Sequence, residues 1–382
     1  PDRPENGAIM LQVGVSNSPA QQPLTRAAGD TYVALSQDTK FKLRVQGTWT
    51  GKTPSEIINV TTATAGAGQP FAAGTENPLT FDPVLFWDDY GTGDPANEAT
   101  GRKNGLDILA VAVDNATMEI SDTEWGDNTK SWALQTEGTD VLTKDILVAN
   151  NLSDGKTPLT FENRNDKEKS RLIFQHLMSK ITFNLTPADG FMLTNGKYAF
   201  TARPTVTLNR NRYKDGALPP GGDYALVEGT INIRKAEATP SPTSMKKITA
   251  GYETEKEVSG HKVETQVALV YPGTCLGAAD EDVVARIEAD NNYYYVTAKE
   301  IRAAIDNVAG HTGDYKTKAG YNYIINVTVK KTDVNVTATV TNWVDVQADE
   351  AFPVIALTAG AGSTGETGDW TTITGEGFDF FR

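Results

Sequence analysis

Two alternating runs near the C-terminal end constrain the fold more than any other feature. Residues 321–329 read Tyr-Asn-Tyr-Ile-Ile-Asn-Val-Thr-Val, and residues 334–341 alternate valine or alanine with asparagine or threonine. Successive side chains of a strand point to opposite faces, so each run presents one apolar face. The polar residues 330–333 between them predict a turn. The pattern therefore predicts a hairpin with one buried face in a β-rich chain that has a packed core.

Several other short runs are typical of strands. They alternate apolar and polar residues or are compact and apolar, and turns rich in glycine, proline and serine separate them. Such punctuation favours all-β sandwiches over α/β units. The runs lie at residues 9–15, 40–46, 106–113, 145–149, 205–208, 224–233, 262–271 and 293–297. Residues 298–307 predict a short helix, whereas residues 61–80, rich in threonine, alanine and glycine, predict a surface loop.

Residues 172–185 predict one long strand, because the turn that follows and the β-branched residues favour a strand over a helix. Its shared face would carry Ile173, Leu177, Ile181, Phe183 and Leu185. A polar and charged stretch precedes it, at residues 154–169. A chain of 382 residues is too long for one ordinary β-sandwich. We therefore expect two domains, residues 1–168 and residues 169–382.

The charge balance excludes one class of partner. The chain has 35 Lys and Arg against 49 Asp and Glu, a formal net charge of −14, and its pI is near 4.8. Nucleic-acid binding needs a basic surface, so we expect no nucleic-acid partner. The single cysteine, Cys275, can form no internal disulfide, and we expect a small buried side chain there. No stretch approaches the roughly 18 apolar residues of a membrane span.

The residues that most often carry catalysis form no recognisable motif. His176, His261 and His311 are far apart in the sequence, and none has a metal-ligand neighbour at zinc-like spacing. Residues 360–365 match a G-x-G-x-x-G pattern, but no helix follows that would hold a pyrophosphate, so a flexible loop is expected there. We expect no enzyme activity and no cofactor.

Two further clusters leave alternatives open. Asp88, Asp89 and Asp94 resemble loop acids that hold a hard cation, but their spacing does not fit an EF-hand and a solvated turn is favoured. Residues 293–295 are three tyrosines, which would form a glycan-stacking platform if exposed. In a β-protein such tyrosines are more often packed in the core.

Several stretches together resemble the fimbrillin family of Bacteroides-type bacteria, which contains pilus subunits and related surface proteins. The segment at residues 174–183 resembles the family's F-x-H-x-x-S-K-I motif, and Thr25-Arg26-Ala27 resembles its T-R-A element. The stretches in the expected order after it are Phe86-Trp87-Asp88-Asp89, residues 109–113, residues 321–327 and residues 340–343.

This resemblance implies the architecture and the location of the chain. It implies an all-β protein of two tandem transthyretin-like Greek-key β-sandwich domains with few short helices. It also implies export as a lipoprotein to the outer membrane and the cell surface. The family's lipidated cysteine is missing from this sequence, which is consistent with trimming just before Pro1.

For a stalk subunit, the resemblance implies assembly by strand exchange with other pilus subunits. A trypsin-like protease cuts after an arginine, the first strand leaves, and the C-terminal strand of a neighbour fills the groove. Here the removable strand would be residues 8–15, with Ile9, Leu11, Val13 and Val15 in the groove, and Arg26 would be the processing site. The donor-strand candidates are Phe352, Val354, Ile355, Leu357, Ile373, Phe378 and Phe380.

Three functions remain open at this point. The first is a structural pilus subunit that supports adhesion. The second is a tip or anchor adhesin of the same family, which would keep its first strand, leave Arg26 as an ordinary loop arginine, and bind host glycan or protein. The third is a secreted glycan-processing enzyme, which would need two convergent acids in a cleft. The sequence marks no such pair.

Overall fold

The computed structural model describes the strands and helix of the chain together with short connections. The described residues are 7–16, 32–35, 37–47, 57–71, 74–87, 106–113, 132–133, 145–150, 159–166, 170–188, 190–208, 223–225, 230–232, 248–270, 276–277, 279–308, 311, 313 and 315–342. Within this part of the chain almost every element is a strand, and the single helix α3 is short, at Lys299–Asp306. The all-β prediction is confirmed, whereas the transthyretin-like Greek-key topology stays a prediction.

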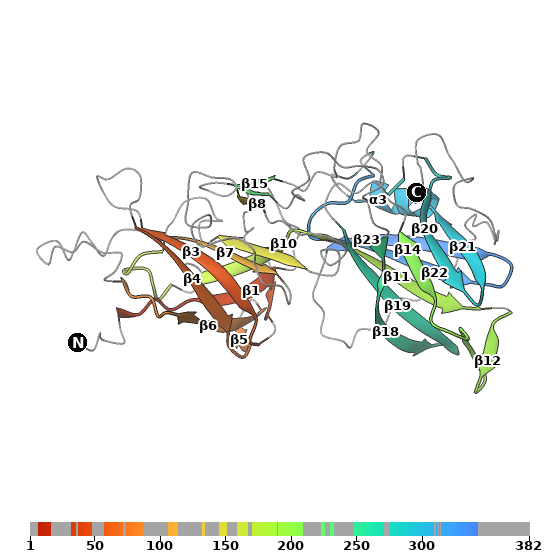
Figure 1. Cartoon of the computed structure of the whole chain (residues 1–382), viewed down its shortest axis with the longest axis horizontal. Helices are drawn as coiled ribbons and strands as arrows, with labels where there is room; N and C mark the ends of the chain where they lie inside the picture. Colours follow the sequence, from red (N-terminus) through yellow and green to blue (C-terminus); the bar gives the residue numbers. More distant parts are fainter. Residues whose placement is uncertain are drawn as a thin grey trace, which may run out of the picture. The chain divides into compact units, whose positions relative to one another are not determined.

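The strands divide into two compact units (Figure 1). The first unit is drawn mainly in red to yellow and holds a 9-stranded sheet. Its strands are β1 (Gln12–Ser16), β2 (Tyr32–Val33), β3 (Lys40–Gly47), β4 (Ile57–Ala65), β5 (Gln69–Phe71), β6 (Gly74–Asp82), β7 (Leu106–Val113), β9 (Ile146–Asn150) and β10 (Arg171–His176). A separate small sheet joins β8 (Trp132–Ala133), β15 (Asp223–Ala225) and β16 (Thr230–Asn232).

The large sheet of the first unit closes on itself. The pairing runs β1-β10-β9-β7-β3-β4-β6, and β6 then pairs with β1 again. The ring encloses a core in which Phe41 meets Phe174 edge to face, at 5.3 Å between ring centroids. Inward side chains come from alternate positions of each strand, as the pleat requires. Every strand of the ring therefore contributes to one shared hydrophobic core.

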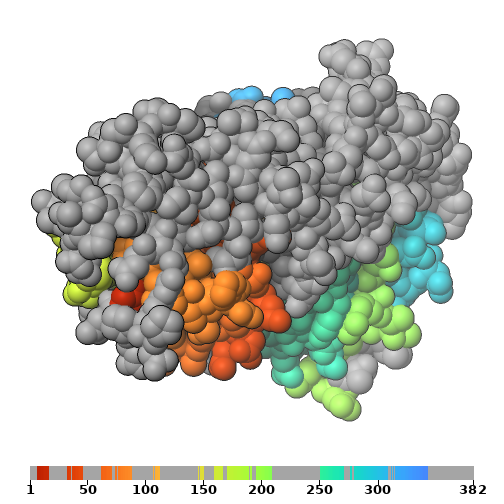
Figure 2. All heavy atoms as spheres, turned by 60° about the vertical axis from the view of Figure 1, so that its left-hand side comes forward, coloured from red at the N-terminus to blue at the C-terminus, as the bar shows by residue number. Residues whose placement is uncertain are grey.

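The second unit packs two sheets against each other. One sheet contains β12 (Met192–Thr194), β13 (Lys197–Ala199), β19 (His261–Val270), β11 (Ser179–Pro187), β22 (Tyr321–Val329), β23 (Val334–Asn342) and β18 (Gly251–Val258). The other contains β17 (Ile248–Thr249), β14 (Thr205–Leu208), β20 (Val283–Ala289) and β21 (Asn292–Thr297). Apolar residues of both sheets and of α3 form one core. The strand β18 lies along the surface, and teal atoms from this part of the chain reach the surface in Figure 2.

The predicted hairpin and helix are confirmed. Strands β22 and β23 pair in antiparallel register from Val329 and Val334 to Tyr321 and Asn342. Their core face carries the valines and Tyr323 that the alternation placed there. The polar face is also ordered, because Asn184 on β11 donates from Nδ2 to Oδ1 of Asn326 at 2.8 Å. Cross-strand pairs of this kind fix the register of the sheet.

Two predictions about secondary structure are wrong. Residues 61–80 are not a surface loop, because they include the end of β4, all of β5 and most of β6. The small side chains of Ala63 and Ala65 are fully buried in the ring, so a composition poor in large apolar residues still forms strands here. Residues 172–185 are not one strand but the two strands β10 and β11, which belong to different units.

The break between β10 and β11 has a clear physical reason. On β10 the core side chains are Leu172 and Phe174, at even positions. On β11 they are Ile181, Phe183 and Leu185, at odd positions. The alternation changes phase around Leu177 and Met178, so a single strand could not bury both sets. Ile173 accordingly lies outside the core cluster of the first unit, contrary to the predicted face.

Candidate functional site

The first strand, β1, has partners on both sides. It runs parallel to β10, with Val13 opposite Leu172, and antiparallel to β6, with Val13 opposite Asn77. The amide of Gln12 donates to the carbonyl of Ser170 at 3.0 Å, and the amide of Leu79 donates to the carbonyl of Leu11 at 3.0 Å. An N-terminal strand paired on one edge only could peel away at low cost. This one is an interior strand of the ring.

The pairing continues upstream of β1 as far as residue 8. The amide of Ile9 donates to the carbonyl of Leu85 at 2.9 Å, and Ala8 forms an isolated bridge with Phe86. The four predicted groove residues, Ile9, Leu11, Val13 and Val15, are 2%, 1%, 0% and 2% exposed and belong to one core cluster. The structure thus brings these four side chains together in the core. That the strand is removable stays a prediction.

β1 holds the ring closed because both of its neighbours change partners along their length. β10 pairs with β1 through residues 171–174 and with β9 through residues 175–176. β6 pairs with β1 through residues 77–78 and with β4 through residues 79–82. Without β1, residues 171–174 and 77–78 would each lose a row of hydrogen bonds and expose a strand edge.

Three side chains cross over β1 on its outward side, and we call Tyr32, Glu76 and Arg171 the clasp. Nε of Arg171, on β10, lies 2.6 Å from Oε2 of Glu76, on β6, and both side chains are almost fully buried. Since β1 lies between these two strands, the ion pair spans it. The guanidinium carbon of Arg171 lies 4.9 Å from the centre of the Tyr32 ring, within cation–π range.

The clasp leaves no room for a side chain at Gly14. A Cβ at Gly14 would lie 2.7 Å from Cδ2 of Tyr32 and 3.2 Å from the carbonyl oxygen of Val33. Real Cβ contacts are not that short, so any other residue would force the ring or the backbone to move. Glycine in the interior of a strand commonly marks such a close approach.

One buried polar side chain on the inward side of β6, that of Asn77, has partners for both of its polar atoms. Nδ2 of Asn77 donates to the carbonyl oxygens of Leu35 and Gly66 at 3.0 and 2.7 Å, and its Oδ1 accepts from the amide of Leu35 at 2.8 Å. Three such bonds offset the cost of burying an amide. They also fix the backbone of β6 where it faces β1.

The remaining site candidates lie outside the described residues. Arg26 falls between β1 and β2, in residues 17–31, which the structure does not describe. The donor-strand candidates lie beyond the last described residue, Asn342. They are Phe352, Val354, Ile355, Leu357, Ile373, Phe378 and Phe380. Their roles stay predictions, and so does the cation site at Asp88, Asp89 and Asp94.

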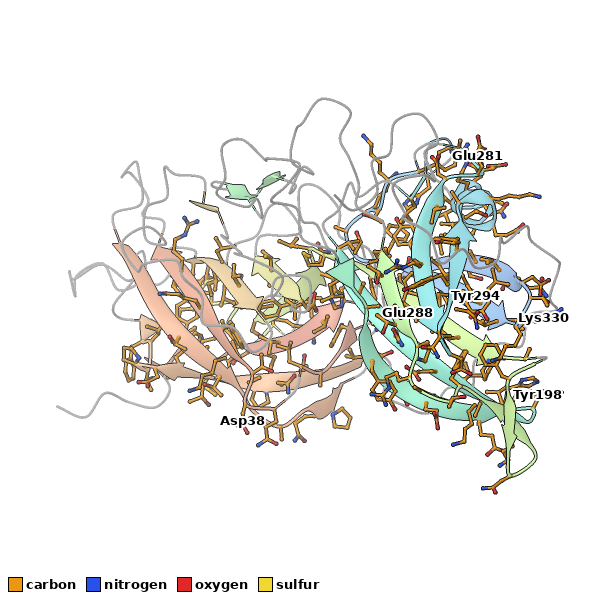
Figure 3. The ribbon with its side chains drawn as sticks, turned by 45° about the vertical axis from the view of Figure 1, so that its right-hand side comes forward. Asp38, Tyr198, Glu281, Glu288, Tyr294 and Lys330 are labelled. Atoms are coloured by element: carbon orange, nitrogen blue, oxygen red, sulfur yellow. The ribbon has the colours of Figure 1, made fainter. Side chains whose placement is uncertain are left out.

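The three histidines do not converge on one site. Nδ1 of His176 lies 2.8 Å from Oδ2 of Asp145 in the first unit. His261 stacks on Tyr198, which Figure 3 labels, and its Nδ1 lies 2.7 Å from the carbonyl oxygen of Pro187. His311 packs against Tyr321, at 4.5 Å between ring centroids. Each ring therefore has its own local packing.

The other clusters behave as parts of the fold. Tyr294 and Tyr295 are buried, so the three tyrosines do not form one exposed platform, and burial raises the pKa of Tyr294 (Figure 3). Asp280 binds Arg302 at 2.9 Å, and Asp282 is buried and accepts from the amide of Ala279. Within the described part of the chain, no group of three or more histidine, cysteine or acidic residues is placed to hold a metal ion. No described helix has the length and apolar character to cross a membrane.

Sequence reasoning found the buried residues of β1 but missed the clasp. Gly14 carried a signal, since a glycine within an alternating run indicates close backbone approach or a bulge. Glu76 lay in the stretch that was interpreted as a loop. Glu76 and Arg171 are 95 positions apart in the sequence. They meet because β6 and β10 both pair with β1. No local pattern encodes that meeting.

Comparison with known proteins places the chain in a family. A search of curated proteins found no match. Among solved structures, a candidate cell adhesion protein from Bacteroides uniformis is 14% identical, with 89% of this chain and 100% of that chain covered and a TM-score of 0.44. The tip fimbrial protein Mfa3 from Porphyromonas gingivalis is 10% identical, with coverage of 87% and 100% and a TM-score of 0.34. The sequence model of the family described as Fimbrillin-like matches residues 101–343. Since this match spans more than half of the chain, the protein belongs to the fimbrillin-like family.

Proposed function

We propose that the protein is a structural subunit of a cell-surface pilus, that it supports adhesion, and that it assembles by proteolysis-dependent strand exchange. The observation that carries the proposal is the position of β1. It is the first strand that the structure describes, it closes the ring of the first unit, and together with the paired segment just before it, it buries four apolar side chains there. In the sequence Arg26 follows it, so a cut after Arg26 would separate β1 from the rest of its chain.

The energetics favour exchange over simple loss of the strand. Full burial of a large apolar side chain contributes about 1.5–3 kcal/mol, so Ile9, Leu11, Val13 and Val15 together contribute on the order of 6–12 kcal/mol. A whole domain is stable by only about 5–15 kcal/mol. An empty groove would therefore remove most of the stability of the first unit. A strand from another copy can restore both the burial and the hydrogen bonds.

Several finer features belong to this proposal. The processing enzyme is a trypsin-like protease, because the site is an arginine. The partners are other pilus subunits, and host glycan or protein is the adhesive target. The protein is exported as a lipoprotein to the outer membrane, and its two units are transthyretin-like sandwiches. The fimbrillin-like family supports the surface location.

The proposal is tested by cutting the purified full chain with a trypsin-like protease and following its mass. We expect the cut protein to form oligomers and the oligomers to begin at Ala27. Arg26→Ala blocks the cut and leaves a monomer. Arg3→Ala is the matched control, because Arg3 precedes β1 and its loss leaves the β1 segment and Arg26 intact.

Two results would overturn the proposal. If the chain is cut after Arg26 and stays monomeric at high concentration, it is not a stalk subunit. If the chain resists cutting and keeps its first strand, a tip or anchor adhesin is the better assignment. Sequencing the N-terminus of the monomer separates these two results, because the monomer begins at Ala27 in the first and keeps the residues before Ala27 in the second.

A further inference from the structure

The groove that holds β1 makes a specific demand on any strand that replaces it. The inward positions of β1 and of the paired segment just before it, residues 9, 11, 13 and 15, are apolar. The outward position between the last two is Gly14, where a Cβ would lie 2.7 Å from Cδ2 of Tyr32. A replacement strand that keeps the pairing of β1 meets the same ring. The groove thus calls for alternating apolar residues and one glycine at a fixed place.

The Tyr32 ring cannot easily make room. Tyr32 is 1% exposed, and the Arg171 guanidinium lies against its face, where the ion pair with Glu76 holds it. The backbone of Tyr32 is equally confined, because a Cβ at Gly74 would lie 2.0 Å from the Tyr32 carbonyl oxygen. A ring that is packed on several sides moves only at a cost in packing.

One segment of this chain repeats the pattern of β1. Residues 9–15 read Ile-Met-Leu-Gln-Val-Gly-Val, and residues 355–361 read Ile-Ala-Leu-Thr-Ala-Gly-Ala. The first two inward residues are identical, and the next two are valine in one segment and alanine in the other. The glycine occupies the same sixth position. The two outward residues before the glycine differ, with Met10 and Gln12 in one segment and Ala356 and Thr358 in the other.

The other glycines after Phe352 do not fit the groove. Placing Gly365, Gly368, Gly375 or Gly377 under the clasp puts glutamate, aspartate or threonine at inward positions. Placing Gly362 there puts a serine at the last inward position. Burying such groups without partners is costly. Gly360 alone leaves all four inward positions apolar.

We infer that the clasp selects its replacement strand by this glycine, and that residues 355–361 of another copy of the chain are that strand. The inference rests on the proposed strand exchange and names its donor segment. It favours Ile355 and Leu357 over the other donor candidates, because Phe352 and Val354 lie in the opposite phase of the alternation. Ile373 and Phe380 have no glycine in the required register, and the register that places Gly377 under the clasp and Phe378 inward also places threonine and glutamate at inward positions.

The inference is tested with two matched variants of the cut full chain, Gly360→Val and Gly362→Val. We expect Gly360→Val to lower the oligomer yield by about tenfold or more, as for an overpacked core position. Gly362→Val should assemble like wild type. Valine has a higher strand propensity than glycine, so a general effect on strand formation would raise the yield of both variants.

A second variant pair tests the clasp itself. In the cut chain, Gly360→Ala alone should reduce assembly, and Tyr32→Ala added to it should restore part of the loss, because the ring that meets the Cβ is gone. If Gly360→Val assembles as well as wild type, the glycine rule is wrong and the strand exchange still stands.

A labelled peptide of residues 352–364 tests the glycine requirement of the groove separately from the proposed assembly by strand exchange. We expect it to displace the cut first strand from the groove, and a peptide with Gly360→Val not to do so. If wild type fails to assemble but the two peptides differ in this way, the proposed assembly is wrong and the selectivity of the groove is right. If both peptides displace the strand equally, the inference is overturned.

Discussion

Because Gly14 has no side chain, the side chains of the clasp, Tyr32, Glu76 and Arg171, can pack together over β1. The Arg171–Glu76 ion pair spans β1, and the Tyr32 ring against which Arg171 packs lies where a Cβ at Gly14 would collide with it. A buried ion pair is costly to form and costly to break when one partner is lost. The clasp therefore contributes more to the placement of β1 than to the overall stability of the fold.

The first prediction concerns Gly14 in the uncut chain. Gly14→Ala should lower the free energy of unfolding by about 1–3 kcal/mol, because the new Cβ overpacks the site against Tyr32. Gly7→Ala is the control, since its Cβ would meet its nearest neighbour, Phe86, at an ordinary 3.9 Å. Denaturant unfolding of both variants checks this. Equal stabilities of Gly14→Ala and wild type would contradict the close approach.

The second prediction concerns pH and a carboxyl group in the second unit. Burial raises the pKa of Glu264 above its ordinary value of 4.5, and the hydrogen bond from Gln266 and the charge of Arg203 oppose this only in part. The folded state then holds the proton at a pH where the unfolded state has lost it. Stability should therefore fall as pH rises from about 4.5 through the raised pKa, and stay lower above it.

Glu264→Gln removes this titration and keeps an acceptor for Gln266. We expect the variant to be more stable than wild type at neutral pH and equally stable below pH 4.5. Glu281→Gln, at an exposed position labelled in Figure 3, serves as the control for the loss of one carboxylate. Melting temperatures across this pH range make the comparison. A constant difference at all pH values would rule out the titration of Glu264.

Residue patterns predicted the inward set of β1 but not the residues over it. Ile9, Leu11, Val13 and Val15 follow a period of two, which any strand with one buried face shows. Arg171 and Glu76 meet only because β10 and β6 flank β1 in the folded ring. Charged residues at such positions would ordinarily be assigned to a solvated face.

Among the elements, β1 joins β10 to β6, so its loss would open the ring of the first unit. Its side chains fill the core and its backbone pairs on both edges. The exchange that we propose replaces the contacts of β1 with those of a donor strand. Its rate therefore depends on how stably β1 is bound in the groove. The apolar side chains before and within β1 should limit that rate, because their burial is lost when the strand is released.

The third prediction follows from this dependence. In the cut chain, Leu11→Ala should speed the release of the first strand to an added donor peptide, because the lost burial amounts to about 2–5 kcal/mol. Met10→Ala is the control, since Met10 is 64% exposed. The released strand is quantified by mass spectrometry over time. Equal release from both variants would show that core burial does not limit the exchange.

Element boundaries were predictable where the alternation was strong and unbroken. The hairpin of β22 and β23 and the helix α3 follow directly from their residue patterns. Strands β4 to β6 did not, because alanine and threonine gain their strand character here from packing in the ring. Between β10 and β11 the buried side chains change from even to odd positions. This change can be recognised only when the residues of each unit's core are known.

For the whole molecule, the strand exchange that we propose would join copies of the chain. Each copy carries a net charge of −14, so copies repel one another at low ionic strength. Strand exchange adds no charge to the groove, because the inward positions of residues 355–361 are apolar. The net charge should therefore affect the rate at which copies meet more than the stability of the donor strand in its groove.

The fourth prediction follows from this repulsion. Assembly of the cut chain should become faster as salt is raised, because the Debye length falls from about 30 Å at 0.01 M to about 8 Å at 0.15 M. Light scattering over a salt series measures the rate. A rate that falls with added salt would indicate assembly through opposite charges and would argue against exchange of an apolar strand.

The most direct test of the account is the mass of the subunits within assembled oligomers. Oligomers grown from the cut chain are isolated, and denaturing mass spectrometry asks whether residues 1–26 are present. If strands are exchanged, these residues are absent from all subunits except one at the end of each oligomer, because a neighbour fills every other groove. Oligomers that keep residues 1–26 in every subunit would contradict strand exchange, since β1 would then still occupy its own groove.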